Sequence, residues 1–128
     1  MLYGTLFRRG PSLPDSWSAA IGYMGQAAAR LEGQLGSRHA GLAAIIVRPE
    51  SGQSAESARE QVDAILRTEP GTASIRVEIQ DDELGTHWII HRGTALKNLV
   101  RDMQAVGEAL MNHDMEARIV AAVFPFTW

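Results

Sequence analysis

Residues 74–91, SIRVEIQDDELGTHWIIH, hold two short strand patterns separated by a turn. Ile75, Val77 and Ile79 alternate with polar or charged residues, and this alternation predicts a half-exposed strand over 74–80. The acidic, glycine-containing segment 81–85 is typical of a turn, and the residues after it predict a second strand over 87–91. The stretch therefore predicts a β-hairpin.

The hairpin is flanked on each side by one helix pattern and one strand pattern. Before it, the apolar run LAAIIV at 42–47 predicts a strand covered on both faces, and Ser54 can cap the helix that follows. After it, Thr94 can cap a helix with a clear apolar stripe, and 118–124 predicts a last strand. The order β-α-β-β-α-β predicts the α+β class and a ferredoxin-like split sandwich.

An additional helix is predicted N-terminal to this unit. Apolar residues recur at helical spacing over 16–35, and either Asp15 or Ser16 can cap the helix. Residues 1–14 contain two glycines and two prolines, so they are interpreted as an N-terminal segment and linker. Residues 15–128 are then expected to form a single α+β domain.

Right-handed crossovers would place both helices of the ferredoxin-like unit on one face of an antiparallel sheet. Strands 42–47 and 86–91 are expected at its centre, with 74–80 and 118–124 at its edges. Within the last helix, Leu99, Val100 and Met103 are expected to be buried against the sheet near Trp88 or Ile90 of the hairpin.

The composition excludes several classes of protein. The 128 residues are 45% hydrophobic, which is enough for a core of ordinary size. The sequence has no cysteine, so disulfides and thiolate metal sites are excluded. A net charge of −3 argues against nucleic acid as a partner. We expect a cytoplasmic protein, because no apolar run is long enough to span a membrane. The short apolar and basic start allows only weak peripheral membrane contact.

The polar residues of the hairpin do not predict catalysis or a cofactor. His87 and His91 share a strand face but would lie roughly 13 Å apart, too far for one metal ion. They are interpreted as polar residues near solvent at the strand ends. The acidic residues of the turn are interpreted as a solvated cluster. No nucleophile elbow or phosphate-binding loop is present, so we expect no enzyme activity and no cofactor.

The strongest functional hint is the last strand, which is apolar on both faces and is predicted to be an edge. An edge strand presents unpaired backbone groups to other chains. The side chains expected to form a protein interface, in a homo-oligomer or with another partner, are Val120, Ala122, Phe124, Phe126 and Trp128. The alternative is that the helix at 16–35 and the C-terminal FPFTW segment cover this strand within one monomer.

Three segments carry a family resemblance: AARLEGQLGSRHAGLAAIIVRPESGQSAESAREQVDAIL, DDELGTHWIIHRG and LVRDMQAVGEALMNHDMEARIVAAVFPF. Their order and spacing resemble the PspA-associated protein family PspAB over about residues 27–126, in a short form that lacks a C-terminal segment. The resemblance implies an accessory protein of the phage-shock envelope-stress response and a PspA-like coiled-coil partner. It implies no catalytic residues.

We therefore expect a non-catalytic adaptor that binds a protein partner. Two alternatives remain open at this stage. One is a ferredoxin-like small-molecule sensor, which would need an apolar pocket with a few convergent polar groups. The other is a small acidic dimer that resembles secretion chaperones and holds an unfolded client.

Overall fold

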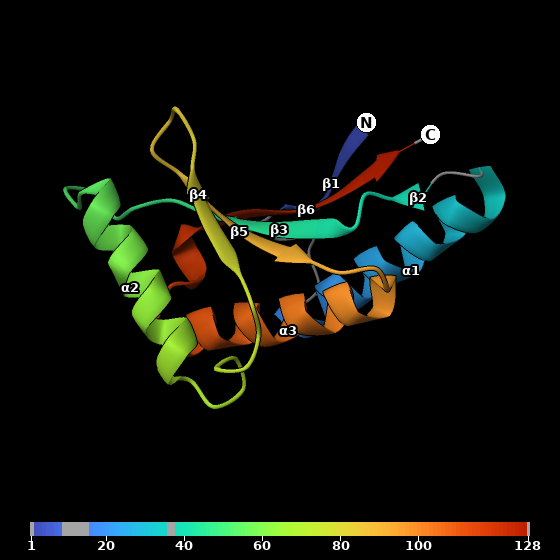
Figure 1. Cartoon of the computed structure of the whole chain (residues 1–128). Helices are drawn as coiled ribbons and strands as arrows, with labels where there is room; N and C mark the ends of the chain where they lie inside the picture. The colour runs from blue at the N-terminus through green and yellow to red at the C-terminus, as the bar shows by residue number, and fades with distance from the viewer. Residues whose placement is uncertain (1, 9–15, 36–37, 128) are drawn as a thin grey trace.

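An antiparallel sheet and three helices share one hydrophobic core (Figure 1). The computed structural model describes residues 2–8, 16–35 and 38–127. The elements in chain order are β1 (Leu2–Arg8), α1 (Trp17–Leu35), β2 (Arg38–His39), β3 (Leu42–Val47), α2 (Ala55–Thr68), β4 (Glu78–Asp81), β5 (His87–Arg92), α3 (Leu96–Asn112), the short 3-10 helix η1 (Glu116–Arg118) and β6 (Ile119–Thr127). The predicted α+β class and ferredoxin-like arrangement are confirmed.

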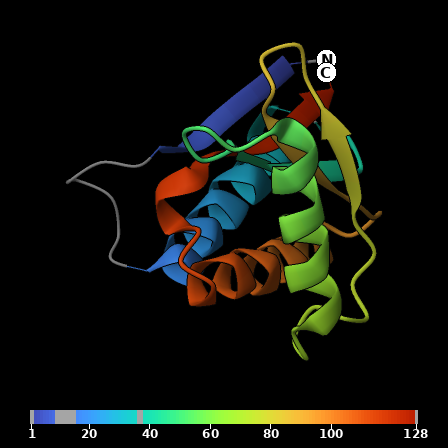
Figure 2. The ribbon, with the colours of Figure 1, turned by 90° about the vertical axis from the view of Figure 1, so that its left-hand side faces the viewer.

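The four strands of the ferredoxin-like unit lie in the order β6-β3-β5-β4. Every pairing in the described sheet is antiparallel. β3 and β5 are therefore central, as predicted, and β4 forms one edge. Viewed from the side, α1 and α3 run beneath the sheet while α2 stands next to β4 (Figure 2).

The prediction that the last strand is an edge is wrong. β1 pairs with β6 from Leu2 opposite Phe126 to Arg8 opposite Ala121, and β2 pairs with the end of β6. β6 thus lies between β1 and β3, and its backbone groups are used on both sides. Residues 2–8 also belong to the same sheet as the rest of the chain.

The predicted hairpin is present, but its first strand starts later than expected. β4 begins at Glu78 rather than at residue 74. The amide of Ile75 donates instead to the carbonyl of Thr72 at 2.9 Å, which keeps the start of this segment in a turn. Ile75, Val77 and Ile79 nevertheless all pack partly buried against the core, as their alternation predicts.

Two of the predicted helix starts are confirmed by side-chain hydrogen bonds. The hydroxyl of Ser16 accepts from the amide of Ala19 at 3.0 Å, and the hydroxyl of Ser54 accepts from the amide of Ser57 at 3.1 Å. Each bond satisfies one of the free amides of a first turn. At the third helix the cap position is Ala95, one residue after the predicted cap Thr94, and the alanine side chain offers no capping hydrogen bond.

One face of the sheet meets the helices and forms the core. Ile45, Ile89 and Phe124 are fully shielded on this face, on three different strands. The helices bury apolar stripes against it, as amphipathic helices do. The larger helix side chains in this core are Trp17, Ile21, Met24, Val62, Ile65, Leu66, Leu99, Met103 and Leu110.

The face of the hairpin that meets the core is the opposite of the one predicted. Leu99 and Met103 are buried as expected, but Val100 is only partly buried, and the core that they share contains Ile89 and not Trp88 or Ile90. Neighbouring strand residues point to opposite faces, so the position of Ile89 directs both of its neighbours away from the helices.

Several side chains on the second face of the sheet are also buried within this chain. Ala44, Ile90, Ala121 and Val123 point away from the helical core, and each is buried. The apolar surface left open on this face is therefore smaller than the sequence predicted, although Ile46 and Trp88 are only half-buried there. Burial of these four side chains within one chain weakens the argument that a second copy covers them.

α1 and α3 pack closely at the N-terminal end of α1. The indole of Trp17 is buried over Gly107, and its Nε1–H donates to the carbonyl oxygen of Met103 at 2.8 Å. The side chain of Gln104 donates to the carbonyl of Ser18 at 2.9 Å. These contacts fix α1 against α3, and α1 also contacts β1 and β2, the two strands that pair with the C-terminal part of β6.

Candidate functional site

The residues predicted to form an interface do not lie together on the surface. Ala122, Phe124 and Phe126 are buried in the core beneath α1. Val120 is 44% exposed, because the register of β6 against β3 shifts at this residue and leaves it outside the paired positions. Trp128 lies outside the described residues. The core position of three of these side chains corrects the expectation of an apolar interface on this strand.

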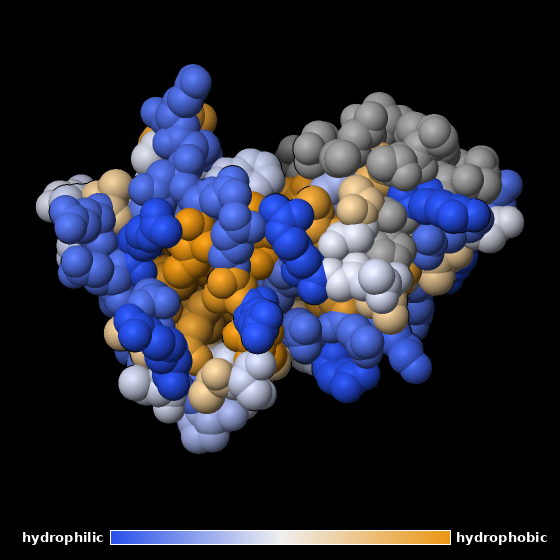
Figure 3. All heavy atoms as spheres, viewed as in Figure 1, coloured by the Kyte–Doolittle hydropathy of each residue, from blue (hydrophilic) through white to orange (hydrophobic). Residues whose placement is uncertain are grey.

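A different surface, a groove between α2 and β4, has the features of a binding site. Its volume is about 660 Å³, and its walls come from one face of α2 and from the edge of the sheet. An apolar region is visible between these two elements, flanked by hydrophilic side chains (Figure 3). The residues that line the groove are Glu56, Arg59, Glu60, Asp63, Val77, Glu78 and Ile79.

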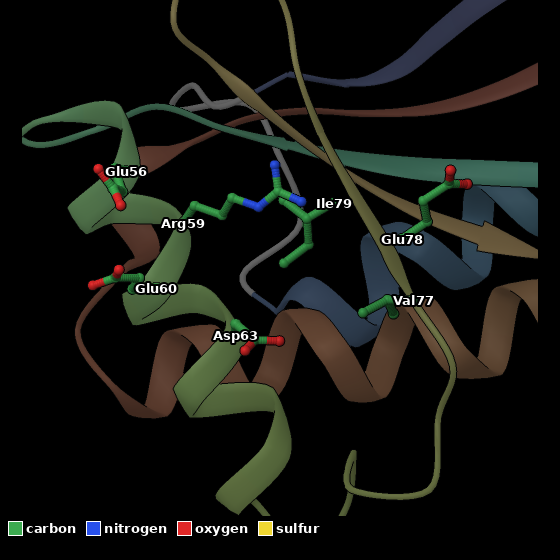
Figure 4. A pocket seen from close by; sticks show the side chains of 7 residues that line it. All are labelled: Glu56, Arg59, Glu60, Asp63, Val77, Glu78 and Ile79. Carbon is green, nitrogen blue, oxygen red and sulfur yellow. The ribbon is translucent and has the colours of Figure 1, made fainter.

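Apolar side chains form the sheet side of the groove. Val77 and Ile79 point from the β4 segment toward α2 and are half-buried. Glu78 lies between them and faces the other side of the sheet, yet it also lines the groove (Figure 4). Residues from both faces of one strand can line a groove only where it follows the strand's edge. The groove therefore runs along the open edge of the sheet.

Arg59 extends from α2 into the groove. Its guanidinium lies 3.7 Å from the carboxylate of Asp81, and that carboxylate also bonds Nδ1 of His87 at 2.7 Å. His87 is completely buried, whereas Arg59 and Asp81 are each about half exposed. This chain of polar contacts joins α2 to the end of β4 at one end of the groove.

The rim of the groove is mainly acidic. Four of its seven lining residues are carboxylates, and only Arg59 is basic. Glu78 is paired with Arg92 at 3.1 Å, and a hydrogen bond from Gln80, followed by the contacts with Arg92, lowers the pKa of Glu78. Glu56 and Glu60 form no ion pair with any residue that the structure describes. The rim therefore stays negatively charged at neutral pH.

The acidic turn beside the groove has a structural role that the sequence did not reveal. The carboxylate of Asp82 accepts hydrogen bonds from the hydroxyl of Thr86, the indole of Trp88 and the amides of Leu84 and Thr86. These bonds, led by the one from the Thr86 hydroxyl, lower the pKa of Asp82 to about 2. Asp82 thus holds the hairpin closed, and only the tip of the turn is left to solvent.

The interpretation of both histidines as residues near solvent is wrong. His87 and His91 are 0% and 1% exposed, because their strand face is the one that meets the helices. Burial lowers the pKa of His91 to about 4, and the backbone groups of Ala43 and Ile89 oppose this shift only in part. His91 is therefore neutral in the folded protein at physiological pH.

The buried neutral state of His91 predicts a loss of stability in acid. An unfolded chain takes up a proton at His91 near pH 6.5, but the folded chain does so only near pH 4. The contribution of His91 to stability is fully present above pH 6.5. As the pH falls toward 4, this residue lowers the free energy of unfolding by roughly 3 kcal/mol. Urea melts at pH 7 and pH 4 measure this loss. His91→Leu should show a correspondingly flatter pH dependence, and identical pH profiles for both proteins would contradict the prediction.

A smaller hollow of about 430 Å³ lies between α1 and α3. Its walls are formed mainly by small or apolar side chains, among them Gly22, Ala29, Leu96 and Val100. Among the described residues, no three histidine or acidic side chains gather as a metal site requires. None of the helices in the described ranges has the length and hydropathy needed to cross a lipid bilayer.

The comparison with protein families decides the identity. The family model of PspA associated protein B matches residues 3–128. The chain belongs to the PspA associated protein B family. Membership gives it a PspA-related accessory role, which the partial resemblance over residues 27–126 had implied. Searches of curated proteins and of solved structures found no match to this chain.

Sequence reasoning found parts of this groove without recognising the whole. The alternation of Ile75, Val77 and Ile79 was read correctly as one inward-facing row. The acidic face of α2 was not recognised, although the helical spacing of Glu56, Glu60 and Asp63 could have indicated it. No sequence signal shows that these two surfaces enclose an open groove, since that depends on the distance between α2 and the edge of the sheet.

Proposed function

We propose that this PspA associated protein B family member is a non-catalytic adaptor that binds a PspA-related partner protein in the groove between α2 and β4. The observation that carries the proposal is an unpaired sheet edge beside a groove with an apolar wall and a charged rim. Protein interfaces combine these same parts, an apolar centre and a polar rim. The family's association with PspA supplies the class of partner.

Self-association through the last strand, which the sequence suggested, has lost its physical support. β6 is paired on both sides, and α1 covers its inner apolar side chains. The acidic groove also suits a basic partner better than a second copy of this acidic chain. The proposed assembly is therefore a complex with a different protein.

Reversing the unpaired rim charges should weaken the complex. Glu56→Lys with Glu60→Lys replaces two carboxylates that have no ion pair to lose, so the fold should be retained. We expect at least tenfold weaker binding to the PspA-family protein of the same genome, measured by isothermal titration calorimetry at 0.15 M salt.

A matched control separates the groove from general charge effects. Glu83→Lys with Glu108→Lys makes the same change in net charge at two exposed residues that do not line the groove. The control should bind about as well as the wild type. Equal weakening of both double variants would remove the groove as the site. Absence of binding by the wild-type chain would refute the proposed function.

A further inference from the structure

We propose that the groove recognises an extended segment in which apolar residues alternate with lysine or arginine, and that this segment adds to the sheet as a strand beside β4. The inference rests on the proposed function, because it takes the groove to be a protein-binding site. It specifies the conformation and the charge of what the groove binds.

The backbone of β4 has free hydrogen-bonding groups at the correct spacing. The amide of Asp82 donates to the carbonyl of Thr86 at 3.0 Å, so these opposite residues occupy a hydrogen-bonded position of the hairpin. Such pairs alternate along an antiparallel ladder, so Gln80 and Glu78 also bond β5. Ile79 and Asp81 must then direct their amides and carbonyls away from β5.

These outward groups have no partner among the described residues. No backbone hydrogen bond joins Ile79 or Asp81 to any described segment beyond β5. Two residues at strand spacing therefore offer two donors and two acceptors to the groove. Exposed groups in this arrangement are what strand addition uses, since an incoming extended segment can pair with all of them.

The side chains that line the groove define the inward face of the added strand. Val77 and Ile79 point toward α2, so every second residue of an added strand would point the same way, into the space that α2 covers (Figure 4). Apolar residues fit at these inward positions because they extend the row that the two β4 side chains begin. The residues between them would lie on the opposite face, next to Glu78.

The negative charge of the groove determines which residues fit the remaining positions of the added strand, and it disfavours pairing of β4 with a second copy of β4. Glu78 lies on the same face as these remaining positions and favours lysine or arginine there, and Glu56 and Glu60 on α2 add to the overall negative charge of the groove. A second copy of β4 would instead bring its own Glu78 and Asp81 against the same rim. Like charges on adjacent strands are destabilising, so the observations favour a basic segment of another protein.

Hydrogen exchange at single amides tests the proposed pairing directly. The probe is a capped peptide of alternating valine and lysine, added to the isotope-labelled full chain and followed by NMR. We expect amide exchange at Ile79 and Asp81 to slow at least tenfold, because an added strand would bond these groups. Glu78 and Gln80, already bonded to β5, should change much less.

Two further peptides test the alternation and the charge. A peptide of the same composition with its valines and lysines in separate blocks should give little protection, and so should one that alternates valine with glutamate. The Glu56→Lys/Glu60→Lys variant should lose much of the preference for lysine over glutamate, because two negative charges of the groove become positive.

Protection confined to α2, with none at Ile79 and Asp81, would show side-chain docking and overturn strand addition. Failure of every peptide to bind would also overturn it. Neither result depends on the PspA-family protein, so failure here is distinguishable from failure of the proposed function. Protection at Ile79 and Asp81 by the alternating peptides alone supports the inference.

Discussion

Gly107→Ala is expected to destabilise the fold by about 3–5 kcal/mol, although alanine is the better helix former. A Cβ at this position would overlap Nε1 of Trp17, far inside any permitted contact. The indole would have to leave its buried site and give up its hydrogen bond to the carbonyl of Met103. Denaturant melts followed by circular dichroism measure the loss, which is a large share of the stability of an ordinary domain.

Gly33→Ala is the matched control for this substitution. Gly33 is an exposed residue of α1, and a Cβ there meets nothing within 4 Å. The same change should therefore raise stability by up to about 1 kcal/mol through helix propensity alone.

A double-mutant cycle tests the cause. With Trp17→Ala already present, Gly107→Ala should cost little, because the clash has been removed. An additive effect of the two substitutions would show that Gly107 is required for a reason other than the indole.

Phe124→Ala is expected to cost about 3–5 kcal/mol, because the side chain is fully buried between β6 and the helices. The same substitution would cost the protein little stability if the Phe124 side chain lay in an exposed interface. The substitution therefore discriminates between the core position and the interface suggested by the sequence. Thermal and urea unfolding of the purified variant provide the measurement.

Val120→Lys supplies the comparison on the same strand. Val120 is 44% exposed at the shift in register, so a lysine there can reach solvent. The free energy of unfolding should therefore change by no more than about 0.5 kcal/mol. Collapse of the fold on this substitution would mean that Val120 is a core residue. A small cost for Phe124→Ala would contradict its placement beneath α1.

Sequence reasoning predicted the helices and most strand positions because their signals are local. The stripe that includes Leu99 and Met103 has the 3.6-residue period of a helix, and the alternation over 75–79 has the two-residue period of a strand. Each period reports which side chains share a face. It does not report which of the two faces of a strand is buried, and this is why the positions of His87 and His91 were mistaken.

The candidate site was less predictable than the fold. The prediction placed the binding surface on β6, since an apolar strand at the end of the unit is typical of an edge. The pairing of residues 2–8 with β6 joins segments more than a hundred residues apart, and no local pattern encodes it. The groove depends in the same way on how far α2 lies from β4.

By itself, the sequence determined the element order β-α-β-β-α-β, the preceding helix, the absence of cysteine chemistry and the PspA associated protein B resemblance. These follow from residue types and short periods along the chain. Only the tertiary structure decided that β1 covers the edge of β6, that Ile89 rather than Trp88 faces the helices, and that β4 keeps an open edge beside α2. Those features are set by packing and hydrogen bonding between distant segments, whose geometry exists only once the chain has folded.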